Sequence, residues 1–223
     1  MRDVTLVFDL DGTLVDTAPD LIGALNKVLA MEGLAPVSLG DAKHLVGAGV
    51  RALVERGLRE HGHCVPPERF DELMAAFLDH YVANIAFESR PFPDMVPVLE
   101  SLALEGARLA VCTNKLERLA RMVLDQLELS PHFAAIGGGD TFGASKPDPR
   151  HLLGTIERAG GDAKRAVMIG DSLTDLRAGR EAAIPVVLVD FGYTDVPAAE
   201  LGADAVIGSY RELRPALKQL GFG

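Results

Sequence analysis

The sequence predicts an α/β fold in which a parallel sheet carries a small inserted group of helices. Short apolar runs typical of buried strands recur at residues 4–8, 108–112, 134–136, 166–169, 186–189 and 205–207. Helical patterns separate the later runs, and this alternation indicates parallel βαβ units in a doubly wound sheet. The first and second runs are separated by residues 9–107, which are largely helical in pattern. The insertion therefore follows the first strand.

The first strand ends in the stretch LVFDLDGTLVDT, residues 6–17. Asp and Gly favour turns, so the simplest interpretation is that Asp9, Asp11 and Gly12 only end the strand. Side chains alternate along an extended segment, however, so Asp9 and Asp11 are expected to project to the same side. Like charges this close raise each other's pKa unless a cation or hydrogen-bond donors are present. The pair therefore suggests a metal ion.

The insertion has apolar residues at i, i+3, i+4 and i+7, the spacing of amphipathic helices. This spacing occurs at residues 20–33, 41–62 and 67–85. Residues 88–95 then contain two prolines, which end the helical pattern and return the chain to the sheet. We therefore expect residues 16–88 to form a helical cap domain, and residues 1–15 and 89–223 to form the core.

Polar residues follow several of the later predicted strands. Thr113 and Asn114 follow the second run, and Lys146 stands in a loop before a helix that begins after proline. Asp171 follows the fourth run, and Asp175 lies four residues further on. Each has an ordinary structural interpretation when taken alone, such as a solvated lysine or a helix N-cap. Because ligands bind at the carboxyl ends of parallel strands, we expect the set to converge with the first two aspartates.

Four acids, a hydroxyl, an amide and an ammonium suit phosphoryl transfer. Mg²⁺ prefers oxygen ligands, and it would take oxygens from Asp9, Asp171 and the neighbourhood of Asp11. The ion would offset the repulsion between an aspartate and a phosphate dianion. A carboxylate would attack phosphorus to give an aspartyl-phosphate, while Asp11 protonates the leaving oxygen and later activates water. Lys146 and Thr113 would hold the transferring oxygens.

The segments DLDGTLVDT, TNK, KPDP and GDSLTD resemble, in order, the four motifs of the haloacid dehalogenase superfamily of phosphohydrolases. This resemblance covers essentially the whole chain and implies a Rossmann-like core with a helical cap after the first motif. The roles it implies are Asp9 as nucleophile, Asp11 as acid and base, Thr113 and Lys146 as stabilisers of the phosphate, and Asp175 as a supporting carboxylate. It also implies that Mg²⁺ binds Asp9, the main-chain carbonyl of Asp11, and Asp171.

The presence of Asp11 favours a phosphate ester as substrate, because the dehalogenases of the superfamily lack this second aspartate. The cap segment VGAGVRALVERGL, residues 46–58, is most similar to that of phosphoglycolate phosphatases, which implies hydrolysis of 2-phosphoglycolate to glycolate. The substrate carboxylate would need a donor from the cap. Arg51 and the main-chain amides of residues 47–49 are the first candidates, and Lys43 and His44 follow. Thr113, Asn114 and Lys146 are expected to bind the rest of the substrate.

Other functions stay open at this point. One alternative is a phosphatase for another small phosphorylated metabolite or a sugar phosphate. A second is a phosphosugar mutase similar to β-phosphoglucomutase, which would use the same aspartyl-phosphate but need a second phosphate site in its cap. A third is a binding module that kept the fold without the activity. A module of that kind would have no reason to retain a buried acid cluster that costs stability when unpaired.

Composition limits the classes of partner that we expect the protein to bind. The net charge of -10 argues against a general nucleic-acid or anionic membrane surface, because such surfaces are basic. No apolar run approaches the roughly 20 residues of a transmembrane helix, and no signal-peptide core follows Met1. We therefore expect a cytoplasmic protein whose partner is a small phosphorylated metabolite. Monomer and homodimer are both compatible with the sequence.

Overall fold

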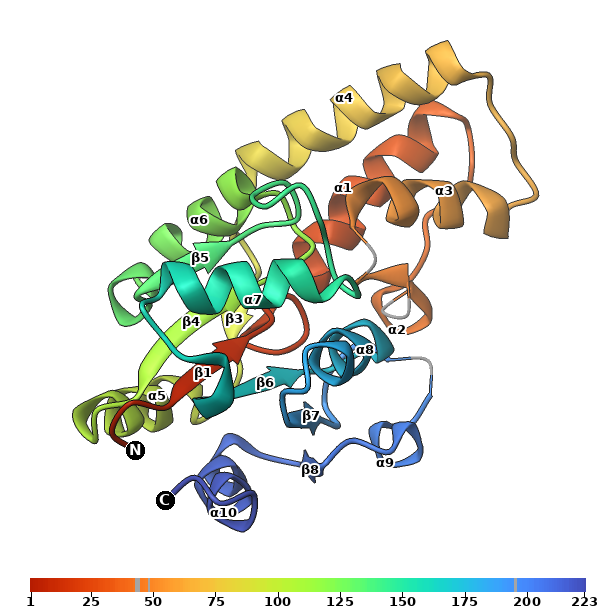
Figure 1. The fold of residues 1–223 in the computed structure, drawn as a ribbon. Coiled ribbons are helices and arrows are strands. Elements are labelled where there is room, and N and C mark those ends of the chain that lie inside the picture. The colour runs from red at the N-terminus through yellow and green to blue at the C-terminus, as the bar shows by residue number, and fades with distance from the viewer. Residues whose placement is uncertain (43–44, 48, 195) are drawn as a thin grey trace.

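A computed structural model describes residues 1–42, 45–47, 49–194 and 196–223. A six-stranded sheet lies at its centre in the order β5-β4-β1-β6-β7-β8, and every neighbouring pair is parallel (Figure 1). The strands are β1 Thr5–Phe8, β4 Arg108–Cys112, β5 Ala135–Gly137, β6 Ala166–Gly170, β7 Val186–Val189 and β8 Ala205–Ile207. The predicted runs agree with these strands to within one residue at each end, so the α/β prediction is confirmed.

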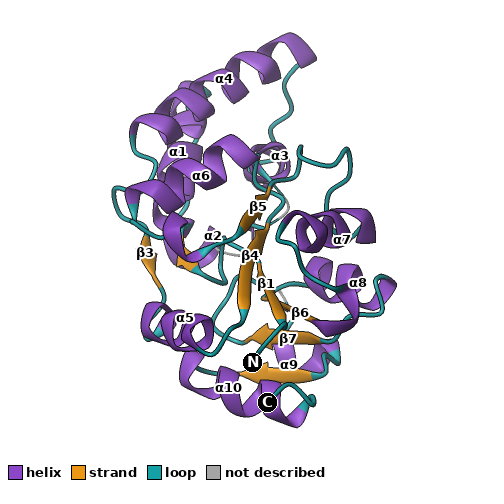
Figure 2. Cartoon of the chain, turned by 60° about the vertical axis from the view of Figure 1, so that its left-hand side comes forward, coloured by secondary structure: helices purple, strands orange, loops and turns teal. Residues whose placement is uncertain are grey.

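Helices cover both faces of this sheet (Figure 2). On one face lie α5 Met95–Leu104, α6 Glu117–Gln126 and α10 Leu213–Gln219, and on the other lie α7 Pro149–Arg158, α8 Leu173–Glu181 and α9 Ala198–Leu201. Short 3-10 helices are found at Ser130–His132, Ala163–Arg165 and Tyr210–Glu212. Strand β1 shows why both faces are needed: Leu6 and Phe8 belong to the first apolar cluster, and Val7 belongs to the second. A strand buried on both faces is mostly apolar, as Leu6, Val7 and Phe8 are here.

The inserted helices follow the first strand, as the sequence predicted. They are α1 Ala18–Met31, α2 Leu39–Ala42, α3 Val50–Glu60 and α4 Pro67–Ala83. Figure 1 shows α1, α3 and α4 beyond the sheet, on the side toward which β1 points. Two short antiparallel strands, β2 Val15–Asp16 and β3 Arg90–Pro91, flank the insertion. The sequence did not predict this pair, because two residues are too few to show an alternating pattern.

Hydrogen bonds join the two ends of the insertion. Asp20, in the first turn of α1, accepts hydrogen bonds from the main-chain amide of Glu88 at 3.0 and 3.2 Å. The same carboxylate accepts from the amide of Ser89 at 2.8 Å and from its hydroxyl. Asp20 is buried, so these donors replace the water that the carboxylate would otherwise bind. The first turn of α1 and residues 88–89, at the two ends of the insertion, are therefore held together.

No helix in the described part of the chain is both long enough and apolar enough to cross a lipid bilayer.

A buried histidine in α7 gives a prediction about stability. The His151 side chain is fully buried, with its ring 6.0 Å from that of Phe142. Burial and the nearby Lys146 ammonium lower the pKa of His151 to about 4. An unfolded chain would bind this proton at a pKa of about 6.5. Between these two values the unfolded state holds more protons, so stability is lost as the pH falls from about 6.5 to 4.

Between pH 7 and pH 4.5, we therefore expect the free energy of unfolding to fall by about 2 kcal/mol less in His151→Leu than in the wild type. Urea denaturation at both pH values, for the variant and the wild type, measures this difference. His132→Leu, at a half-buried histidine, is measured beside it as the control for replacing a histidine with leucine. Equal pH dependence in the wild type and His151→Leu would contradict the prediction, whatever the variant does to absolute stability.

Candidate active site

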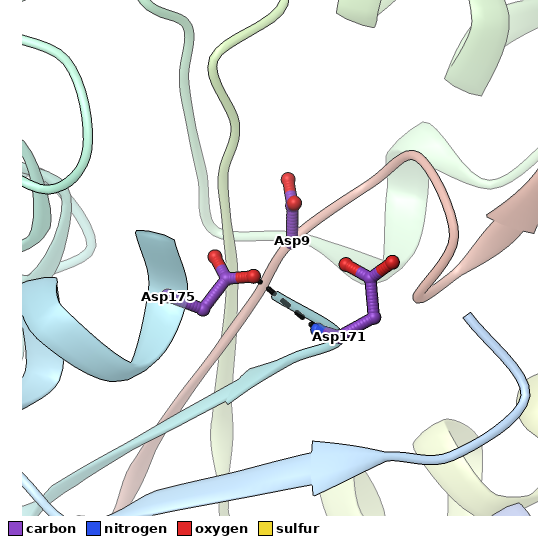
Figure 3. A group of neighbouring side chains, drawn as sticks. All are labelled: Asp9, Asp171 and Asp175. Atoms are coloured by element: carbon purple, nitrogen blue, oxygen red, sulfur yellow. Dashed lines mark hydrogen bonds between the residues drawn. The ribbon is translucent and has the colours of Figure 1, made fainter. Parts of the chain in front are cut away.

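Three buried carboxylates meet at the carboxyl edge of the sheet (Figure 3). Asp9 directly follows β1, Asp171 directly follows β6, and Asp175 lies in the first turn of α8. One oxygen of each lies within 4.8 Å of the others. Ser172 fixes Asp175, because the carboxylate accepts from the Ser172 amide at 3.1 Å and from its hydroxyl at 2.6 Å in a capping box. The first turn of α8 therefore holds the Asp175 carboxylate beside the ends of β1 and β6.

Lys146 supplies a positive charge to this acid cluster. Its Nζ lies 3.0 Å from Asp9 Oδ1 and 2.6 Å from Asp175 Oδ1, and its side chain is buried. The Asn114 side chain binds the main chain of Lys146. Its Nδ2 donates to the Lys146 carbonyl at 2.9 Å, and its Oδ1 accepts from the Lys146 main-chain amide at 2.8 Å. The structure thus brings together Asp9, Lys146, Asp171 and Asp175, as the sequence predicted.

Burial controls the protonation of the acids. It raises the pKa of Asp9 to about 6; Lys146 opposes this rise, and Asp175 and Asp11 add to it. Burial also raises the pKa of Asp171 well above its usual range, and the neighbouring charges of Asp175 and Asp9 contribute. Buried carboxylates that repel one another are stabilised by a divalent cation, and a donor set made only of oxygen is the type that Mg²⁺ prefers. The residues present therefore fit this ion.

The Asp11 carboxylate lies outside that group of three acids. Both of its oxygens lie 2.8 Å from Lys115 Nζ, and Oδ1 also accepts from the Thr17 hydroxyl at 2.6 Å. Lys115 is buried, and its Nζ lies 5.1 Å from the ring centre of Tyr81 in α4. The predicted metal ligand was the main-chain carbonyl of Asp11, so the position of the side chain does not bear on it.

Sequence reasoning assigned no role to Lys115, although it is the last residue of the TNK segment. Its position next to Asn114 was the available signal. After the strand ends, the alternation of side chains stops, so the sequence does not show which way this lysine points. Burial raises the energetic cost of its charge, but the nearby Asp11 carboxylate outweighs that effect and raises the pKa of Lys115. The lysine is therefore charged across the physiological pH range.

A pocket opens between the strand ends and the inserted helices, with an empty volume of about 390 Å³, part of which is open to solvent. It is lined by Asp9, Asp11, Leu21, Val46, Gly47, Gly49, Val50, Leu53, Thr113, Asn114 and Lys115. Four of the predicted site residues therefore line one pocket: Asp9, Asp11, Thr113 and Asn114. The Thr113 hydroxyl also accepts a hydrogen bond from the Lys115 amide at 3.2 Å, which fixes its position.

Arg51 does not line this pocket. Its guanidinium lies over the ring of Phe70 at 4.7 Å, with Nη1 3.2 Å from Glu55 Oε1, and its side chain is 64% exposed. It belongs instead to a separate groove that also includes Arg59 and His63. The structure therefore does not bring Arg51 to the predicted site. The other two cap cations considered from the sequence, Lys43 and His44, lie outside the described residues.

Tyr193, in the loop after β7, connects the acid cluster to the start of the insertion. Its main-chain amide donates to Asp171 Oδ2 at 2.7 Å. Its hydroxyl donates to Asp16 Oδ1 and accepts from the Ala18 amide at 3.0 Å, at the beginning of α1. Gly12 makes room for this arrangement: it has a φ of 79°, and a Cβ there would collide with Asp171 and with the Tyr193 ring. Sequence reasoning missed Tyr193 because no local pattern marks it.

Tyr193→Phe is expected to lower the free energy of unfolding by about 1–2 kcal/mol, because Asp16 and the Ala18 amide lose a buried partner. The main-chain bond to Asp171 would stay, so we expect kcat/KM to fall less than tenfold. Urea denaturation and steady-state kinetics measure the two effects. An unchanged urea midpoint, or a loss of activity far larger than the loss of stability, would show that the hydroxyl does something other than join these segments.

The chain is similar to known proteins in both sequence and structure. A sequence model of the haloacid dehalogenase-like hydrolases matches residues 6–189. A phosphoglycolate phosphatase of Agrobacterium fabrum is 51% identical over 95% of this chain and 91% of its own, and one of Caulobacter vibrioides is 50% identical over 97% and 91%. The crystal structure of a predicted phosphoglycolate phosphatase from Haemophilus somnus superposes with a TM-score of 0.89 at 26% identity, covering 96% of this chain and 97% of its own. The chain therefore belongs to the haloacid dehalogenase-like hydrolases.

Proposed function

We propose that this protein is a Mg²⁺-dependent phosphatase that hydrolyses 2-phosphoglycolate to glycolate and inorganic phosphate through an aspartyl-phosphate on Asp9. The observation that carries the proposal is the placement of Asp9, which is buried beside Lys146 and lines the same pocket as Asp11 and Thr113. Two relatives that share about half of their residues with this chain are named phosphoglycolate phosphatases, and this supports the choice of substrate.

In the first step, a carboxylate oxygen of Asp9 attacks phosphorus while the ester bond to the leaving oxygen breaks. Asp9 Oδ1 is held by the Leu10 amide at 2.7 Å and by Lys146, so the orientation of the carboxylate is set before substrate binds. Asp11 gives a proton to the leaving oxygen. In the second step, Asp11 accepts a proton from the water that attacks the acyl phosphate, which restores Asp9 and releases phosphate.

Lys146 and Thr113 would hold the phosphate oxygens through an ammonium and a hydroxyl. Mg²⁺ would be held by Asp9, Asp171 and the main-chain carbonyl of Asp11, and when bound it neutralises negative charge on the phosphate and aligns it for displacement. Asp175 is a supporting residue, since its oxygens already bind Lys146, Ser172 and the Asp171 amide.

As part of the proposal, residues 16–88 act as a cap over a core made of residues 1–15 and 89–223. The short β2–β3 pair and the Asp20 contacts to Glu88 and Ser89 support a joint at this place. A cap that closes over the pocket would exclude bulk water from the phosphate ester. The proposed enzyme is cytoplasmic and acts on a small metabolite, and the net charge of -10 argues against a nucleic-acid or anionic-membrane partner.

A panel of phosphorylated metabolites, assayed for phosphate release with Mg²⁺ and with EDTA, tests the proposal. We expect 2-phosphoglycolate to have the highest kcat/KM and EDTA to abolish the activity. Faster hydrolysis of another metabolite would replace the proposed substrate. Conversion of glucose 1-phosphate to glucose 6-phosphate would identify a mutase, and no turnover of any member would favour a binding module.

A further inference from the structure

The pocket needs a cation for the second charge of its substrate. Under the proposed function, on which this inference rests, the substrate carries a carboxylate as well as a phosphate. Among the described residues that line the pocket, Lys115 is the cationic side chain. Lys146 approaches Asp9 and Asp175 from within the acid cluster, and Arg51 lies in a different groove.

Lys115 lies close enough to the position expected for the ester oxygen to reach the carboxylate of a bound substrate. To transfer a proton, Asp11 must come within hydrogen-bond distance of the ester oxygen. Lys115 Nζ is 2.8 Å from both oxygens of Asp11, so it lies within two hydrogen-bond lengths of that ester oxygen. In 2-phosphoglycolate a single methylene separates the ester oxygen from the carboxylate. The carboxylate of a bound substrate would thus come within reach of the ammonium.

The surroundings of Lys115 would strengthen such a contact. Its side chain is 2% exposed, and the Tyr81 ring lies 5.1 Å from Nζ, so water is largely excluded. Opposite charges attract more strongly in such an environment than in water. An ammonium has three donors, so Lys115 can keep one hydrogen bond to Asp11 while it donates another to the substrate.

The remaining walls of the pocket limit the length of the substrate. Leu21, Val46, Val50 and Leu53 are apolar side chains of the insertion that line the pocket. A long or highly hydroxylated substrate would leave polar groups unpaired against these side chains, which is unfavourable. A short acid presents its charged groups to the two lysines and only a methylene to the apolar wall.

We propose that Lys115 is the specificity-determining residue that binds the substrate carboxylate, and that the pocket selects short phosphorylated 2-hydroxy acids. Lys115 then has two partners: Asp11, which it holds in place, and the carboxylate, which it recognises. The two roles differ in what they predict. Holding Asp11 affects every substrate that needs the proton, whereas recognition affects only substrates that carry the carboxylate.

The test compares 2-phosphoglycolate with ethyl phosphate, in which a methyl group replaces the carboxylate. The wild type is expected to prefer 2-phosphoglycolate. In Lys115→Met we expect kcat/KM for 2-phosphoglycolate to fall about 10- to 100-fold more than kcat/KM for ethyl phosphate, the range for a hydrogen bond to a charged group. Lys115→Arg, which keeps the charge, should retain part of the preference. Lys27→Met, at an exposed lysine of α1, is the matched control and should change neither value.

Equal losses on the two substrates in Lys115→Met would overturn the inference, because Lys115 would then act only through Asp11. The inference would also be overturned if Arg51→Met lost the preference for 2-phosphoglycolate over ethyl phosphate while Lys115→Met kept it. Arg51 would then be the residue that binds the substrate carboxylate. A wild type that does not hydrolyse 2-phosphoglycolate would refute the proposed function instead. The wild-type measurement therefore separates the two failures.

Removing Lys115 alone leaves the buried Asp11 without its cation, which destabilises the protein. A second comparison therefore changes both residues. Asp11→Asn is compared with Asp11→Asn/Lys115→Met, for binding of 3-phosphonopropionate and propylphosphonate in the presence of Mg²⁺. Titration calorimetry is expected to show a preference for the carboxylated phosphonate in the first protein, reduced about tenfold or more in the second. An unchanged preference would contradict the proposed contact.

Discussion

Asp9→Asn is expected to reduce kcat by about 10⁴-fold or more, because removal of a nucleophile removes the intermediate itself. An amide has almost the same shape as the carboxylate, so the fold and the Leu10 contact to Oδ1 can persist. Steady-state phosphate release from 2-phosphoglycolate and from p-nitrophenyl phosphate measures the loss. Both substrates should be affected alike, since the second needs no help from an acid but still needs the nucleophile.

The matched control for this substitution is Asp79→Asn, which changes an exposed aspartate of α4 and should leave the rate unaltered. Sodium borohydride added during turnover provides an independent check, because it reduces an acyl phosphate to an alcohol. We expect the wild type to acquire homoserine at position 9 and Asp9→Asn to stay unmodified. Asp9→Asn that kept more than about one percent of the activity would exclude Asp9 as nucleophile.

Lys146→Met is expected to have the largest effect on stability. The substitution leaves Asp9, Asp171 and Asp175 buried together without their cation, and breaking a buried ion pair from one side costs about 3–5 kcal/mol. Catalysis should fall about 10³-fold, because the transferring phosphate loses an ammonium. The proposed Mg²⁺ site uses Asp9 and Asp171, so added Mg²⁺ should reduce the loss of stability but not restore the rate.

Urea denaturation with Mg²⁺ and with EDTA measures these two contributions. The expected pattern is a midpoint far below that of the wild type in EDTA, with a larger increase on adding Mg²⁺ than the wild type shows. Lys164→Met, in a short 3-10 helix away from the site, is the control. If Lys146→Met responded to EDTA no more than the wild type, the charge balance inferred for this cluster would be incorrect.

The sequence was informative about the sheet because its strands are buried on both faces. The runs around Leu6 and Val167 are continuous and apolar, and turn residues end them, so their positions could be predicted to within a residue. The same logic located Asp9 and Asp171, since residues at the carboxyl ends of parallel strands must lie near one another. Asp175 was included because it follows Asp171 by four residues within the GDSLTD segment.

Contacts that depend on tertiary structure could not be predicted in this way. Lys115 and Tyr81 are separated along the chain, and their approach depends on how α4 lies against the strand ends. Arg51 shows the opposite case: its segment reaches the pocket through Gly49 and Val50, but the helix turns its side chain toward Phe70. A helical pattern predicts that one face is buried, but it does not show which neighbour receives each residue on the other faces.

The β2–β3 pair has a consequence for how proteins of this kind can change. Val15 lies opposite Pro91, and Asp16 lies opposite Arg90, so the chain leaves the sheet and comes back at neighbouring positions, about 5 Å apart. A tight hairpin can bridge such a gap. Everything from α1 to α4 could thus be deleted, lengthened or exchanged for another segment without moving β1. The apolar wall that the insertion contributes to the pocket can therefore change separately from the residues proposed to perform the reaction.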